Sequence, residues 1–123
     1  MWYLQNEQFS NVLSLERNFR KVIEMQQSRK ERAIATIWFV TRLIEMLYPG
    51  KVEARWFGSY DEPNVLGYPK VKINAFHIDS QVVLGSWEID TSGEQEPPRI
   101  TADDVVSDIL IAIRRLKYFQ SLL

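Results

Sequence analysis

Charged and apolar residues alternate without exception in the stretch Lys51-Val52-Glu53-Ala54-Arg55-Trp56. Successive side chains of a β-strand point to opposite faces, so the apolar residues of this stretch share one face and the charged residues share the other. A charged face has to meet water or a partner. We therefore expect a β-sheet that helices cover on one side only. The open side of that sheet is the working surface that the sequence predicts.

Two more strands are predicted downstream of this one. Residues 70–78 alternate in the same manner, and residues 81–89 carry a further apolar series. Only Asp79 and Ser80 separate the two, which predicts a hairpin with two turn residues. The link between the first two strands, residues 58–69, holds two glycines, two prolines and two tyrosines and indicates a long structured loop.

The first fifty residues read as helix. Residues 33–48 are apolar over most of a helical circumference, which predicts the most buried helix of the fold, with Trp38 in the core. Pro49 and Gly50 end that helix. Before it, an apolar stripe has the spacing of a helix-packing seam and consists of Val12, Leu15, Phe19 and Val22.

Whether these segments form one helix or two depends on Ser28. Ser28 and Glu31 fit a capping box, in which the serine caps a new helix and the glutamate reaches back to it. We expect a break or a sharp kink at this point. The alternative is one helix over residues 6–48, about 63 Å long at 1.5 Å per residue, which would need a second chain to cover its overhang.

The final helix has a clear start signal. Thr101 supplies a capping hydroxyl, and Asp103 and Asp104 follow in the positively polarised first turn. Ile100 and Val105 occupy the positions of a hydrophobic staple. The fold class that follows is α+β, as a single domain over residues 1–123. It has an N-terminal helix or helix pair, a three-stranded antiparallel sheet and a C-terminal helix, with the helices on one face of the sheet.

Composition limits the classes of function. Lysine and arginine total 15 against 16 aspartates and glutamates, so the net charge favours neither nucleic acid nor membrane. Cysteine is absent, which excludes thiolate chemistry. The chain start lacks the basic flank and apolar run of a signal peptide, and a cytoplasmic location is the default expectation. Charge is segregated, because eight acidic residues lie between Asp79 and Asp108 and six basic ones between Arg17 and Arg32. Self-assembly or an internal charge match could use this segregation, and solvated surfaces are the ordinary explanation.

Catalytic and metal-binding motifs are not found in the sequence. His77 is the single histidine, and no nucleophile or orienting partner can be assigned to it. Asp104 and Asp108 lie one helical turn apart, but oxygen-ligand metal sites need several converging ligands at set spacing. We therefore expect no catalytic residues, no metal and no cofactor, and a protein that is not an enzyme.

The open sheet face is the remaining candidate site. It is mostly basic, with an aromatic residue at its edge, and is predicted to present Lys51, Glu53, Arg55, Lys70, Lys72, Asn74 and Phe76. We expect a small protein-interaction or accessory protein that acts through this face and its helix surfaces, in the form of a homodimer. The alternative is a nucleic-acid-binding module that uses the basic residues Lys51, Arg55, Lys70 and Lys72, since basic grooves with stacking rings hold single strands.

Overall fold

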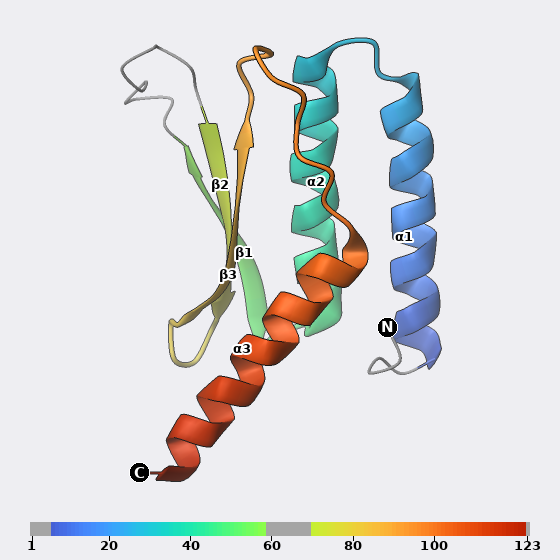
Figure 1. Ribbon diagram of the computed structural model, residues 1–123. Helices are drawn as coiled ribbons and strands as arrows, with labels where there is room; N and C mark the ends of the chain where they lie inside the picture. The colour runs from blue at the N-terminus through green and yellow to red at the C-terminus, as the bar shows by residue number, and fades with distance from the viewer. Residues whose placement is uncertain (1–5, 59–69, 123) are drawn as a thin grey trace.

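The computed structural model describes residues 6–58 and 70–122, with side chains over residues 7–58 and 70–117. The elements follow the order α1 (Asn6–Met25), α2 (Arg29–Leu47), β1 (Val52–Gly58), β2 (Lys70–His77), β3 (Val83–Asp90) and α3 (Ala102–Leu122). The strands form an antiparallel sheet in the order β1-β2-β3, and the helices lie on one side of it (Figure 1). The predicted α+β fold is confirmed. Most of the loop predicted over residues 58–69 lies outside the described residues.

Ser28 divides the helical region in two, as the capping signal predicts. Its backbone is extended (φ −114°, ψ 152°), and its Oγ accepts a hydrogen bond of 3.0 Å from the amide of Glu31. After this break, α2 runs back alongside α1 (Figure 1). α2 ends at Leu47 with Tyr48 as its C-cap, and Gly50 takes φ +79°, a conformation that glycine adopts at little cost. The alternative prediction of one continuous helix over residues 6–48 is therefore wrong.

α2 is the central element of the core, as expected. Its buried residues pack against the sheet, whose inner face supplies the buried residues Val52, Val71, Ile73, Ala75, Leu84 and Ile89. α1 covers α2 from the other side, and the rings of Phe19 and Phe39 stack with centroids 4.2 Å apart. Val12 and Phe19 of the α1 stripe are thus buried within the single chain, whereas Val22 at its end is 43% exposed.

Trp38 does not lie in the core, so that prediction is wrong. Its side chain is 53% exposed, although its neighbours Ile37 and Phe39 are buried. α2 is apolar around most of its circumference, but the sheet and α1 together cover only part of it. Trp38 occupies a part that neither covers.

The β2–β3 connection is longer than predicted. Five residues, Ile78 to Val82, join the strands instead of two. The amide of His77 donates to the carbonyl of Val82 at 2.9 Å, and Gln81 takes the left-handed conformation with φ +60°. The strand register also shifts beside Ala75, which gives Leu84 its buried position as an extra residue. Neither the longer connection nor the register shift can be recognised from the alternation of residues in the sequence.

The start of α3 is formed as predicted. The Asp104 amide donates to Thr101 Oγ1 at 3.1 Å, and the Thr101 amide donates to Asp104 Oδ2 at 3.4 Å, so the two residues cap each other. A carboxylate oxygen of Glu16 in α1 accepts a 2.6 Å hydrogen bond from the Ala102 amide. The buried residues of α3 (Ala102, Val105, Val106 and Ile109) lie in its first half, and its second half extends past the sheet (Figure 1).

Candidate functional site

Most of the predicted residues of the open sheet face share one side of the sheet. Glu53, Arg55 and Phe57 of β1 lie opposite Phe76, Asn74 and Lys72 of β2, on the side of the sheet that faces away from the helices. Lys70 begins β2, and Lys51 directly precedes β1. The alternation of the sequence therefore predicted the side of the sheet correctly for Glu53, Arg55, Lys72, Asn74 and Phe76, whereas Lys51 and Lys70 lie at opposite ends of the β1–β2 pair.

The charge of this face differs from the expected one, because β3 adds acidic residues. Glu88 lies opposite Lys72 and forms an ion pair of 3.4 Å with Lys70, and Asp90 lies opposite Lys70. Hydrogen bonds from Ser92, helped by the charge of Lys70, hold the pKa of Asp90 below its ordinary value. On β1, Arg55 forms an ion pair with Glu53 of its own strand. The face is consequently mixed in charge. The prediction of a basic face rested on the residues of β1 and β2 alone, whereas the polar side of β3 also belongs to this face.

An aromatic cluster lies on the same face. The guanidinium of Arg55 sits 4.6 Å from the centroid of the Phe76 ring, and the rings of Phe57 and Phe76 are 6.1 Å apart. Phe57 is half exposed, and Val83, opposite Phe76 on β3, is 46% exposed. This cluster is the part of the face that could hold a planar or apolar group.

A second apolar surface was missed by the sequence reading and is centred on Trp38. The indole of Trp38 meets that of Trp56 edge to face, with ring centroids 5.1 Å apart, and both side chains are about half exposed. Two hollows share Trp38 as a wall. The first, here called the edge hollow, has a volume of about 340 Å³ and is lined by Ile34, Ile37, Trp38, Trp56, Gly58 and Val71.

The second hollow lies between α1 and α2 and is here called the helix groove. Its volume is about 320 Å³, and it is lined by Leu15, Asn18, Phe19, Val22, Ala35, Trp38, Phe39 and Arg42. The lining residues recur one turn apart on two neighbouring helices, which is the surface against which another helix packs. The signal that could have found this surface is the excess of apolar residues around α2, more than one sheet and one helix can cover.

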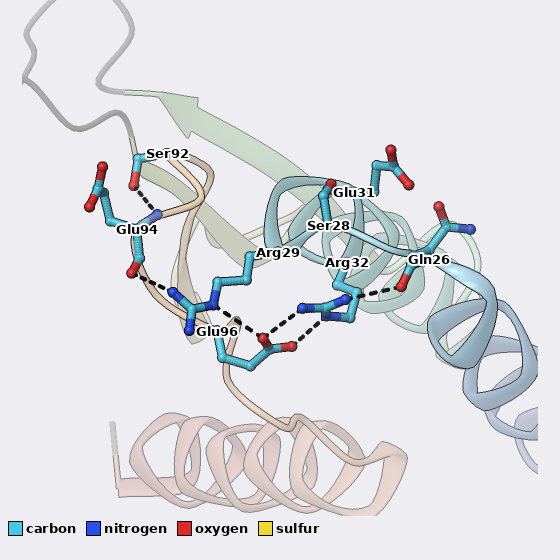
Figure 2. A network of polar contacts seen from close by, with 8 residues as sticks. All are labelled: Gln26, Ser28, Arg29, Glu31, Arg32, Ser92, Glu94 and Glu96. Carbon is cyan, nitrogen blue, oxygen red and sulfur yellow. Dashed lines mark hydrogen bonds and ion pairs between the residues drawn. The ribbon is translucent and has the colours of Figure 1, made fainter.

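Some of the segregated charges pair with one another inside the molecule (Figure 2). Glu96, in the loop before α3, accepts hydrogen bonds of 2.5 and 2.8 Å from the guanidinium of Arg32 and lies 3.6 Å from Arg29. Arg29 also donates to the carbonyl of Glu94, and Arg32 to that of Gln26. The hydrogen bonds from Arg32 hold the pKa of Glu96 below its ordinary value. The network fastens the loop before α3 to the start of α2, so its primary role is structural.

The single histidine of the chain, His77, has its side-chain contacts within the hairpin connection. His77 Nδ1 lies 2.8 Å from Ser80 Oγ and accepts from the Ser80 amide at 3.3 Å, contacts that hold the hairpin connection. Among residues 6–58 and 70–122, no three histidine, cysteine or acidic side chains gather into a metal site. In the same ranges no helix has the length and apolar character needed to cross a membrane. Neither a protein-family model, nor a curated protein, nor a solved structure matches this chain.

Proposed function

We propose that the protein is a non-enzymatic interaction protein that acts as a cytoplasmic homodimer and binds a helix of a protein partner in the helix groove. The observation that carries the proposal is the surface centred on Trp38. Apolar surface that is exposed in one contiguous area, rather than scattered singly, is typical of interaction sites. Here Val22, Ile34, Trp38 and Trp56 are each more than 40% exposed and adjoin two hollows.

The chemistry of the groove defines the partner. Apolar side chains one turn apart fit the apolar stripe of an amphipathic helix, which presents residues at the same spacing. Arg42 is the one charged residue of the lining, and its guanidinium has no hydrogen-bond or ion-pair partner among the described residues. An acidic residue beside the apolar stripe would pair with Arg42. The proposed partner segment is therefore an amphipathic helix with an acidic flank.

Paired valine variants test the proposal. Val22 lines the groove and is 43% exposed, whereas Val83 lies on the open sheet face and is 46% exposed. Wild type, Val22→Glu and Val83→Glu serve as baits in native-cell extract, after circular dichroism has shown that each is folded. We expect a protein that wild type and Val83→Glu retain and that Val22→Glu loses. A partner lost only by Val83→Glu, or one retained equally by all three baits, would contradict the groove. Cell fractionation tests the location.

Nucleic-acid binding by the open sheet face is the alternative. The exposed Phe57 ring, with Phe76 and the Arg55 guanidinium beside it, supports this alternative because bases stack on such groups. The acidic residues Glu53 and Glu88 on the same face weigh against it. Titration of generic RNA and DNA at rising salt separates the two functions. A phosphate binder loses affinity steeply with salt, whereas apolar helix binding does not.

A further inference from the structure

The outer edge of β1 carries backbone groups that point away from the sheet. β1 is an edge strand, because the sheet order is β1-β2-β3. The Ile78 amide donates to the Lys51 carbonyl at 2.9 Å, which fixes the pairing pattern. Since hydrogen-bonded residues alternate along an antiparallel pair, Glu53, Arg55 and Phe57 bond to β2. The backbone groups of the residues between them face outward.

Two outward amides have no acceptor among the described residues. These are the amides of Ala54 and Trp56, which point away from β2, whereas Val52 already donates to the Tyr48 carbonyl at 3.0 Å. The carbonyls of Val52 and Ala54 point in the same outward direction. Such an edge is a template for a further strand.

We infer that the partner at this edge is a second copy of the chain, paired antiparallel about a two-fold axis at Ala54. The inference rests on the homodimer proposed above and names its interface. With the axis at Ala54, the Ala54 amide donates to the partner's Ala54, and the Trp56 amide donates to the carbonyl of the partner's Val52. Both donors are satisfied, and the occupied amide of Val52 is not needed.

The charges of Glu53 and Arg55 favour this register over those in which the two-fold axis lies at a neighbouring residue. With the axis at Ala54, Glu53 lies opposite the partner's Arg55, so the two copies form two cross-strand ion pairs. With the axis at Glu53, two glutamates would lie opposite each other, and with the axis at Arg55, two arginines would. Like charges directly opposite destabilise a strand pair. With the axis at Trp56, Glu53 would have no arginine opposite it.

Exposed apolar residues beside β1, on the face of the sheet that the helices cover, support the same pairing. A two-fold axis perpendicular to the sheet places α2 of both copies on the same face of a continuous sheet. Ile34, Trp38 and Trp56 line the edge hollow beside β1 and are about half exposed in the single chain. The second copy brings the same three residues to this position. The dimer thus covers apolar surface and backbone edge together, and it leaves Val22 and the α1 side of the helix groove open.

The chain has no cysteine, so introduced thiols report the register directly. In the proposed pairing, Glu53 and the partner's Arg55 form a non-hydrogen-bonded pair with Cα atoms about 4.5 Å apart, within the range of a disulfide. Two copies of residue 53 would be roughly 8 Å apart, beyond that range. Glu53→Cys and Arg55→Cys chains carrying tags of different size are mixed and oxidised. The heterodimer retains one Arg55–Glu53 ion pair.

We expect the mixture to form a crosslinked heterodimer several-fold more abundantly than either variant alone forms a crosslinked homodimer. Efficient crosslinking of Glu53→Cys alone would place the axis at Glu53, and that of Arg55→Cys alone would place it at Arg55. Either result overturns this inference. A dimer by sedimentation without any crosslink would move the interface elsewhere and leave the proposed homodimer standing. A monomer by sedimentation would overturn both.

Discussion

The indole Nε1–H of Trp56 in β1 donates a hydrogen bond of 2.8 Å to Oγ1 of Thr41 in α2. Thr41 is buried, and its hydroxyl in turn donates to the Ile37 carbonyl at 2.8 Å. The polar end of the indole is therefore fixed to the core, while the rest of the ring stays half exposed at the sheet edge. This hydrogen bond holds the apolar edge hollow in a defined shape.

Thr41→Val should destabilise the protein by about 0.5–1.5 kcal/mol, because the indole loses its acceptor without any change in packing volume. Thr36→Val is the matched control. Thr36 is equally buried, but its hydroxyl bonds only to the Arg32 carbonyl in its own helix. That change should be close to neutral. Urea unfolding measures both, and equal losses for the two variants would contradict an inter-element role for Thr41.

Phe19→Ala should cost roughly 3–5 kcal/mol, since it removes a buried ring from the stack with Phe39. Val22→Ala, at the exposed position of the same helix stripe, should change stability by less than about 0.5 kcal/mol. Chemical denaturation of both variants checks the difference. Comparable losses would mean that α1 does not pack on α2 through Phe19.

Thr101→Ala should destabilise the protein by roughly 0.5–2 kcal/mol, because the cap of α3 is lost. Ser107→Ala, in the second turn of α3, should be neutral or slightly stabilising, since alanine is the better helix former. Thermal unfolding monitored by circular dichroism measures both changes. A neutral Thr101→Ala would show that α3 begins elsewhere.

The contact between Glu96 and Arg32 should make stability depend on pH in one direction. The pKa of Glu96 is lowered in the folded protein, so its contribution is present above the ordinary glutamate pKa of about 4.3 and is lost as pH falls through the folded value. At pH 7, Glu96→Gln should lower the melting temperature, and the difference from wild type should vanish in acid. Glu94→Gln is the control, because Glu94 joins the network through its backbone carbonyl and amide and not through its carboxylate. A difference that persists unchanged in acid would contradict the ion pair.

The sequence predicted most of the fold because its signals are local. Alternation gave the inner and outer faces of β1 and β2, and the hydroxyls of Ser28 and Thr101 marked the starts of α2 and α3. The connection of the β2–β3 hairpin was harder to predict. A connection that depends on Gln81 in a left-handed conformation and on a register shift beside Ala75 leaves no pattern in the alternation.

The candidate surfaces were harder to predict because they depend on which elements become neighbours. The basic face became mixed only when β3 placed Glu88 opposite Lys72. Trp38 was assigned to the core from the apolar character of α2, yet its exposure depends on how far the sheet and α1 extend around that helix. An apolar helix shows that a surface needs covering, but it does not show which side the rest of the chain leaves open.

Self-association is the central claim of this account, and sedimentation equilibrium of the wild-type chain at tens of micromolar tests it most directly. The outer edge of β1, which pairs with no strand among the described residues, and the exposed side chains of Ile34, Trp38 and Trp56 predict a species with twice the chain mass of 14.5 kDa. A single species near 14.5 kDa over the whole concentration range would contradict the claim.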